Sequence, residues 1–213
     1  MSVFIFTGVG SHLLGMGKEF FEDYQKQIKI ADQVLGYSIK ELCLEDPRHL
    51  LDHSEYVQPA LFIVGMLNFW NKLATGTPSP HYLAGHSMGE TCALCCAGVF
   101  DFETGVRLSQ HRGKLMAKLG VGGMAVIIGL NAMEVRAVLK VNRLDGLDIS
   151  NINSNLQIVI SGSMEDILLG QSVFEKADVI YVQLPVDRPY HSRYMKKTRD
   201  EFYDVLKDFR FTD

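Results

Sequence analysis

Two short apolar runs in the N-terminal part of the chain predict buried strands. The first covers residues 3–6 and is closed by a glycine-rich stretch at 7–11, and the second covers residues 82–84. Between them, residues 58–73 are apolar on nearly every face, which is typical of a buried helix. Further helices are expected over residues 17–28, 30–34, 90–97 and 101–119, the last with Asp101 as its N-cap.

The pattern changes after the glycine-rich stretch at 120–123. The order expected there is strand, helix, strand, strand, helix, strand, which is the ferredoxin-like pattern. These elements fall at residues 124–129, 132–139, 147–152, 157–161, 164–176 and 179–184. We therefore predict an α/β fold with two parts. An α/β hydrolase-like large subdomain with a largely parallel sheet covers 1–121 and 187–213, and an inserted ferredoxin-like (βαββαβ) small subdomain covers 122–186.

The composition of the 213 residues is that of an ordinary globular protein, with 47% hydrophobic and 22% charged residues. The formal net charge is −4, so no basic excess indicates a nucleic-acid partner. No apolar run approaches the ~18 residues that a membrane-spanning helix needs, so we expect no membrane partner. Residues 1–3 lead straight into the first strand, so we expect no signal peptide. We also expect a cytoplasmic protein that acts as a monomer.

The four cysteines do not suggest a disulfide framework. Cys92, Cys95 and Cys96 share one face of a predicted helix, and Cys43 lies far from them in the sequence. A metal site on this helix would need further ligands, and no second Cys/His cluster completes it. We therefore predict small apolar core residues and no metal, with reduced thiols as in a cytosolic protein.

The stretch Gly85-His86-Ser87-Met88-Gly89 matches the G-x-S-x-G nucleophile elbow. An apolar run enters it and a helical run leaves it, which is the strand–turn–helix context that the motif requires. Glycine at both flanking positions permits the close backbone approach of such a turn. The serine hydroxyl would stand at the tip of a strand above a helix N-terminus, where N–H groups and the helix dipole favour negative charge. The alternative is a chance match in a glycine-containing turn.

A serine nucleophile needs a base, and histidine serves most often. The chain has seven histidines. His86 adjoins the serine, so its side chain should point away from the hydroxyl. His191 follows the last expected strand of the small subdomain, where the chain re-enters the large one. From the residues alone, His191 is one candidate among several.

Short blocks over essentially the whole chain match, in order, the motifs of one enzyme family. The blocks are Phe6-Thr7-Gly8-Val9-Gly10-Ser11-His12 with Gly15-Met16-Gly17, Gln58-Pro59-Ala60-Leu61, Gly85 to Glu90, Arg112-Gly113 with Met116, Gly122-Gly123-Met124-Ala125, Asn151-Ile152-Asn153-Ser154, Ile160-Ser161-Gly162 and Pro189-Tyr190-His191-Ser192. Together they resemble the malonyl-CoA:acyl-carrier-protein transacylases, the acyltransferases of fatty acid and polyketide synthesis. The resemblance does not choose between the two pathways.

The resemblance implies a two-step transfer with Ser87 as nucleophile and His191 as base. Ser87 would attack the thioester of malonyl-CoA, and His191 would take its proton and return it to the leaving thiol. The phosphopantetheine thiol of an acyl carrier protein would then attack the malonyl-serine ester, so no further cofactor is expected. The backbone N–H groups of Val9 and Met88 would form the oxyanion hole. Val9 replaces the usual glutamine of the family, but any non-proline residue supplies this N–H.

The resemblance also assigns residues that select the acyl group. Arg112 would bind the free carboxylate of malonate bidentately, with Gln58 and Met116 lining the same site. The alternatives are a surface helix arginine for Arg112 and a polar helix start for Gln58. Tyr190 falls where the family has a bulky phenylalanine for malonyl or a small serine for methylmalonyl, so we favour malonyl. Arg188 departs from the family pattern, which leaves finer selectivity open.

A basic run beside His191 has two interpretations. It would meet CoA phosphates or an acidic carrier protein, or it would be a solvated helix face. Its members are Arg188, Arg193, Lys196, Lys197 and Arg199.

Two other function classes remain open. An acyl hydrolase of the same fold would give the ester to water, but such relatives tend to lack the arginine, so Arg112 argues against it. A catalytically silent interaction module is suggested only by the end of the sequence at Asp213. In the family, further strands and helices that help to orient the histidine follow this point, so we expect weak activity or exposed apolar surface.

Overall fold

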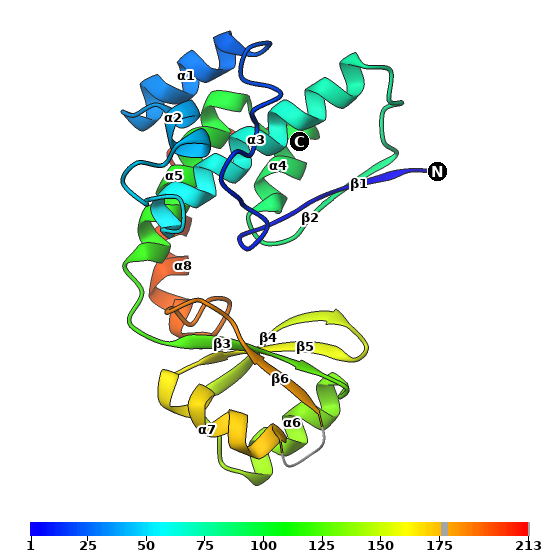
Figure 1. Cartoon of the computed structure of the whole chain (residues 1–213), viewed down its shortest axis with the longest axis vertical. Coiled ribbons are helices and arrows are strands. Elements are labelled where there is room, and N and C mark those ends of the chain that lie inside the picture. Colours follow the sequence, from blue (N-terminus) through cyan, green and yellow to red (C-terminus); the bar gives the residue numbers. More distant parts are fainter. Residues whose placement is uncertain (176–178, 213) are drawn as a thin grey trace. The chain divides into compact units, whose positions relative to one another are not determined.

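The computed structural model describes residues 1–175 and 179–212, which form two compact units (Figure 1). We call Met1–Ala117, together with the residues from Phe202 on, the large unit, and Lys118–Glu201 the small unit. The sequence predicts a return to the large subdomain at 187, whereas the small unit extends to Glu201. Arg193 contributes to this difference because it is bonded to Asp148 within the small unit. His191 is therefore part of the small unit.

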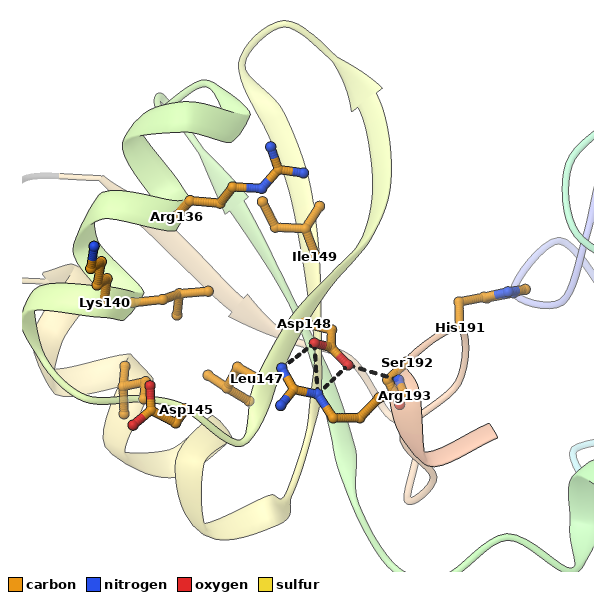
Figure 2. A pocket seen from close by; sticks show the side chains of 11 residues that line it. Arg136, Lys140, Asp145, Leu147, Asp148, Ile149, His191, Ser192 and Arg193 are labelled. Atoms are coloured by element: carbon orange, nitrogen blue, oxygen red, sulfur yellow. Dashed lines mark hydrogen bonds and ion pairs between the residues drawn. The ribbon is translucent and has the colours of Figure 1, made fainter. Parts of the chain in front are cut away.

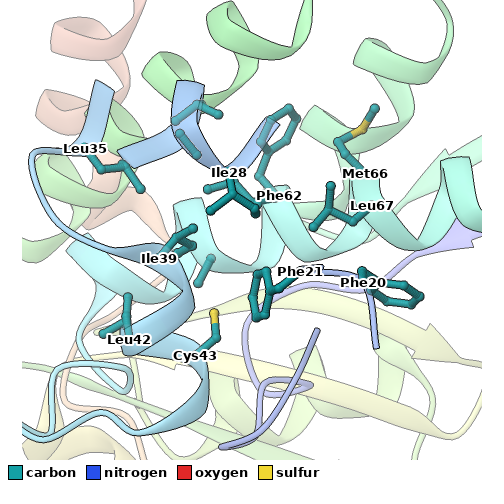
Figure 3. Packing of buried hydrophobic residues seen from close by; sticks show 14 of the residues in the cluster. Phe20, Phe21, Ile28, Leu35, Ile39, Leu42, Cys43, Phe62, Met66 and Leu67 are labelled. Atoms are coloured by element: carbon teal, nitrogen blue, oxygen red, sulfur yellow. The ribbon is translucent and has the colours of Figure 1, made fainter. Parts of the chain in front are cut away.

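The core of the large unit surrounds the long apolar helix that the sequence predicts. The helices of this unit are α1 (Gln25–Leu35), α2 (Ile39–Leu44), α3 (Ser54–Ala74), α4 (Gly89–Cys96) and α5 (Phe102–Ala117). Figure 3 shows side chains such as Ile28, Ile39 and Phe62 meeting in one apolar cluster. Helix α5 packs closely along α3 at Gly105, where a Cβ atom would lie 2.1 Å from the Phe62 ring. This close approach brings the residues of α5 and α3 that line the candidate site together.

Two strands of the large unit, β1 (Val3–Phe6) and β2 (Tyr82–Gly85), pair in parallel, with Phe6 opposite Gly85. This confirms the predicted parallel pairing. The C-terminal ends of both strands lie at the same edge, so the loops that follow them are neighbours. Phe4 and Phe6 pack on Phe69, and alternate strand residues, among them Ile5, are exposed.

The small unit has the predicted ferredoxin-like order. Its elements are β3 (Gly123–Ile128), α6 (Ala132–Val141), β4 (Leu147–Ser154), β5 (Gln157–Gly162), α7 (Met164–Glu175) and β6 (Ile180–Gln183). The four strands form one antiparallel sheet in the order β4-β5-β3-β6. Helices α6 and α7 cover one face of this sheet (Figure 1). The apolar core includes Ile127, Ile160 and Phe174, all fully buried. Strand β4 lies at an edge, which leaves its outer side open for contacts with the chain that follows β6.

Four local features differ from or refine the predicted elements. Residues 17–24 form successive turns, not a helix, and Gly17 has a left-handed φ of 80° that a right-handed helix does not accommodate. Helix α2 was not predicted, because its six residues are too few for a clear period. The N-cap at Asp101 is confirmed, since its Oδ1 accepts the N–H of Thr104 at 2.8 Å. The basic run overlaps α8 (Lys196–Leu206) and a short 3₁₀-helix (Arg193–Met195).

Candidate active site

Ser87 occupies a sharp turn between β2 and α4, as the elbow motif predicts. Its φ of 53° lies in the left-handed region, which a non-glycine residue adopts only when its surroundings hold it there. Those surroundings are backbone. A Cβ atom on Gly89 would lie 2.2 Å from the carbonyl oxygen of Phe6, and one on Gly85 would lie 2.1 Å from the carbonyl carbon of Gly89. The turn therefore exists in this form only with glycine at both positions.

Two backbone N–H groups beside Ser87 are candidates for an oxyanion hole. Met88 precedes the first turn of α4, and Val9 lies in the loop after β1. Neither N–H donates a hydrogen bond to any of the described residues, as expected for donors at a helix start or an open loop. The loop that carries Val9 is held at its far end by His12, whose Nδ1 accepts the Gly10 N–H at 3.3 Å and whose Nε2 lies 2.9 Å from Asp52 Oδ1.

Arg112 of α5 reaches the serine directly. Its Nη2 donates to Ser87 Oγ at 3.2 Å, and its Nη1 donates a short hydrogen bond to Gln58 Oε1. Gln58 is fully buried, and its Nε2 donates to Ser54 Oγ at 2.7 Å and to Met116 Sδ at 3.2 Å. The amide is thus oriented with its oxygen toward the guanidinium. A surface arginine and a simple polar helix start, the two alternatives open at the sequence level, do not fit these contacts.

The backbone also explains why α5 can deliver Arg112 to this place. Gly113 is buried against α3, and a Cβ atom there would lie 2.6 Å from the carbonyl oxygen of Ser54. Glycine next to Arg112 therefore lets α5 pack closely on the first turn of α3. This brings Arg112 near Gln58, which follows that turn. The large unit brings together the predicted residues Gln58, Ser87, Met88, Arg112 and Met116.

His191 and Tyr190 lie in the small unit, in the segment between β6 and α8. The φ of His191 is 58°, again left-handed. Its N–H donates to Met195 Sδ at 2.8 Å, and the next residue, Ser192, donates from Oγ to the Pro189 carbonyl oxygen at 2.5 Å. On the other side of His191, the Tyr190 N–H donates to the Arg188 carbonyl oxygen at 3.0 Å. We call residues 189–195 the histidine loop.

A pocket of about 530 Å³ lies between the histidine loop, β4 and α6 (Figure 2). Its polar lining includes Arg136 and Lys140 of α6 and Asp145 in the turn before β4. Asp148 of β4 binds Arg193 in the same pocket, with Arg193 Nε at 2.9 and 3.0 Å from the two carboxylate oxygens. This hydrogen bonding lowers the pKa of Asp148 and raises that of Arg193. Sequence patterns did not single out Asp148, because its partner is 45 positions away.

The basic run is largely neutralised within the chain. Arg188 pairs with Asp187, Arg193 with Asp148, Lys197 with Glu201 and Arg199 with Asp200. A cation that already has a carboxylate beside it presents less net charge to a phosphate or an acidic protein. These ion pairs favour the solvated helix face over a dedicated phosphate site.

The four cysteines are free thiols, and they fit the predicted core role. Cys43 and Cys92 are buried, and burial raises the pKa of Cys43, Cys95 and Cys96 to about 12, so these thiols stay protonated. Within residues 1–175 and 179–212, no group of three or more His, Cys, Asp or Glu side chains is placed to hold a metal ion. In the same part of the chain, no helix is both long and apolar enough to cross a membrane.

The site has a serine in a nucleophile elbow and an arginine that donates to its hydroxyl. Together with the α/β fold and the ferredoxin-like small unit, these features are typical of an acyltransferase. The chain belongs to the acyl transferase domain family, whose model matches residues 3–212. Among curated relatives, it is 42% identical to the polyketide biosynthesis malonyl CoA-acyl carrier protein transacylase PksC of Bacillus subtilis. That alignment covers 100% of this chain and 74% of PksC.

Two solved structures resemble the fold closely. The malonyl CoA-acyl carrier protein transacylase of Burkholderia pseudomallei has a TM-score of 0.96 and 37% identity, covering 99% of this chain and 73% of that one. A malonyl-transacylase in complex with its type II PKS acyl-carrier protein, PlMCAT:AntF, has a TM-score of 0.91 and 32% identity. This second match covers 99% of this chain and 71% of that one.

Proposed function

We propose that this chain transfers a malonyl group from malonyl-CoA, through an ester on Ser87, to the phosphopantetheine thiol of an acyl carrier protein. The observation that carries the proposal is the Arg112 guanidinium at 3.2 Å from the Ser87 hydroxyl, backed by the buried amide of Gln58. A guanidinium beside the nucleophile would serve as a receptor for a carboxylate, and malonyl is a short acyl group with a free carboxylate. The names of PksC and of the Burkholderia pseudomallei enzyme support the same substrate.

In the proposed first step, Ser87 Oγ forms a bond to the thioester carbon while His191 accepts the hydroxyl proton. The carbon–sulfur bond then breaks, and His191 returns the proton to the CoA sulfur. In the second step, the carrier-protein thiol attacks the ester, and Oγ recovers its proton through the same histidine. Negative charge on the carbonyl oxygen is stabilised by the N–H groups of Val9 and Met88. The reaction requires no metal or prosthetic group of this chain, because the phosphopantetheine belongs to the partner.

Arg112 has a second role in this scheme, since it binds Ser87 before substrate arrives. A malonyl carboxylate replaces the serine oxygen on the guanidinium and so releases Oγ for attack. An acetyl group cannot make this exchange. Gln58 and Met116 line the receptor behind the guanidinium, and the bulk of Tyr190 disfavours an α-methyl branch. We assign the nucleophile and the receptor to the large unit as the catalytic subdomain.

The test is transfer of labelled malonyl and acetyl groups from CoA to a holo acyl carrier protein by wild type and Arg112→Ala. We expect malonyl transfer to fall about 100-fold, because two charge-assisted hydrogen bonds are lost, with no loss for acetyl transfer. Arg107→Ala is the matched control, since Arg107 lies on the same helix but pairs with Glu103 on the exposed side. Equal losses for both acyl groups would contradict the carboxylate receptor.

The fate of the label also separates the proposed transfer from other functions. Label on Ser87 and then on the carrier protein supports the transferase. Release as free malonate in the presence of carrier protein indicates an acyl hydrolase, and no label on Ser87 indicates an interaction module. The PlMCAT:AntF complex supports an acyl carrier protein as partner. We propose that the chain acts as a cytoplasmic monomer, which sedimentation equilibrium and cell fractionation would test.

A further inference from the structure

The backbone at His191 needs support from neighbouring residues. Its φ of 58° is a left-handed conformation that a residue with a Cβ atom rarely adopts. Part of this support is local, because Ser192 Oγ and the Tyr190 N–H bond to carbonyl groups within the loop. Bonds within a loop fix its internal shape but not its place on the sheet. Pro189 lies close to Gly122 at the start of the loop, and the part after His191 needs an attachment of its own.

Asp148 supplies that attachment from the edge strand β4. Its Oδ2 accepts the backbone N–H of Arg193 at 2.7 Å, and its Oδ1 accepts Arg193 Nη2 at 2.5 Å. Arg193 Nε lies within hydrogen-bond distance of both oxygens. One carboxylate therefore holds the main chain and the side chain of the same residue. The Asp148 side chain is 23% exposed and that of Arg193 is 59% exposed, so the acceptor is the shielded partner.

The same end of the sheet holds the loop at a second point. Tyr194 donates its hydroxyl hydrogen to the carbonyl oxygen of Gly146 at 3.2 Å. Gly146 and Asp148 thus bind two consecutive residues that follow His191 closely in the chain. The imidazole of His191 points away from the Asp148–Arg193 pair (Figure 2). Asp148 cannot touch the reacting atoms by this route, and any effect on them must pass through the backbone.

We infer that Asp148 is a positioning residue, which orients the imidazole of His191 by holding the backbone N–H of Arg193. The inference rests on the proposed function, in which His191 moves the proton. An exposed ion pair by itself adds little to stability, because solvent screens it. A bond from the carboxylate to a main-chain N–H acts differently, since it restrains the peptide unit two residues from His191. The effect should fall on the rate of proton transfer more than on substrate affinity.

Three variants of the full chain test this assignment. Asp148→Ala removes both sets of bonds, Arg193→Met removes the side-chain bonds but keeps the backbone N–H, and Asp148→Asn keeps an acceptor of the same shape without the charge. We expect kcat for malonylation of Ser87 to fall about 10- to 100-fold in Asp148→Ala, with KM for malonyl-CoA unchanged. The losses in Arg193→Met and Asp148→Asn should be smaller. Asp145→Ala removes a carboxylate of the same pocket that acts on Arg193 through space without a hydrogen bond, so its loss should be much smaller than that of Asp148→Ala.

Hydrogen exchange of the backbone, read by mass spectrometry, gives a measure that does not depend on activity. We expect faster exchange confined to peptides covering residues 189–195 in Asp148→Ala, with the same rank order of variants as for kcat. If wild type forms no ester on Ser87, the proposed function fails, while the exchange data still report whether Asp148 holds the loop. Unchanged kcat in Asp148→Ala, equal falls in Asp148→Ala and Asp145→Ala, or exchange that rises over the whole small unit would overturn the positioning role.

Discussion

Two turns of this protein hold their key residue in the same rare backbone conformation by different means. Ser87 has a φ of 53° and His191 a φ of 58°. At the serine elbow, neighbouring backbone leaves no room for any residue but glycine on either side. At the histidine loop, a carboxylate and a carbonyl from the β4 end of the sheet hold the chain through hydrogen bonds. The first support is steric and the second is polar.

This difference predicts how each turn responds to change. Steric packing does not depend on pH or salt, and it fails when a single methyl group is added. Polar attachment tolerates small changes of volume, but it weakens when its carboxylate is protonated or screened. The nucleophile should therefore be robust to conditions and fragile to mutation. The histidine loop should be sensitive to pH and salt, and to loss of its polar partners.

The largest effect is expected at the elbow. Gly89→Ala should destabilise the protein by about 3 kcal/mol or more and abolish the Ser87 ester, because the new Cβ atom would meet the Phe6 carbonyl. Urea unfolding and intact mass after incubation with malonyl-CoA would measure both. Gly120→Ala is the control, since a Cβ atom at Gly120 meets nothing within 4 Å. A stable, fully acylated Gly89→Ala protein would show that the elbow is not sterically determined.

A smaller steric effect is expected at the base of the histidine loop. A Cβ atom on Gly122 would lie 2.6 Å from the Gly162 carbonyl oxygen and 2.7 Å from Pro189 Cδ. Gly122→Ala should cost about 1–2 kcal/mol, because its overlap with the Gly162 carbonyl oxygen is smaller than that of Gly89 with the Phe6 carbonyl oxygen at 2.2 Å. Thermal unfolding and the single-turnover rate of acylation would measure it. A loss as large as that of Gly89→Ala would mean that the loop also depends mainly on packing.

The pH dependence of stability should come from the loop and not from the elbow. Arg193 lowers the pKa of Asp148 in the folded state. The stabilisation is therefore present above the unfolded-state value of about 3.9 and is lost as the pH falls through the lower folded-state pKa. Asp148→Asn should be about 1 kcal/mol less stable than wild type at neutral pH, with the difference vanishing in acid. Urea unfolding of both proteins across this range would test it, and a constant difference would contradict the ion pair.

The smallest effect is expected from salt. Raising the ionic strength from about 0.1 to 1 M shortens the Debye length from about 10 to 3 Å, which screens the half-exposed Asp148–Arg193 pair. Backbone exchange in residues 189–195 should speed up about twofold, a change of less than ~0.5 kcal/mol. Exchange at the elbow peptides should stay the same. An equal rise in both regions would erase the distinction between steric and polar support.

The parts of the site that could be predicted from sequence are those built from residues close together in the chain. The elbow needs five consecutive residues, and the buried helix that carries Gln58 follows from its unbroken apolar pattern. Arg112 was a candidate through its family block, but its bond to Ser87 Oγ required the packing of α5 on α3. Asp148 was missed, since an aspartate on an edge strand carries no local sign of a partner 45 positions away.

The basic run illustrates the same limit. The sequence shows five cations near His191, and four of them have acidic partners in the folded chain. Three of these pairs join residues at most four positions apart, and only the Arg193–Asp148 pair joins distant segments. The small unit also extends to Glu201, past the boundary expected at 187. One contact that joins this segment to the small unit is the bond of Arg193 to Asp148, which is 45 positions away in the sequence. Spacing along the chain can therefore indicate the local pairs but not the pair of Arg193 with Asp148.

The sequence alone determined the secondary structure of most segments, the ferredoxin-like order of the small unit, the elbow at Ser87 and the family blocks around Arg112 and His191. These depend on local periodicity, on glycine at fixed spacing and on short motifs. Only the tertiary structure decided that Gln58 is buried against the guanidinium, that Arg112 binds the serine hydroxyl, and that Asp148 holds the histidine loop. Such contacts join segments far apart in the chain, and the packing of helices and strands sets their distances.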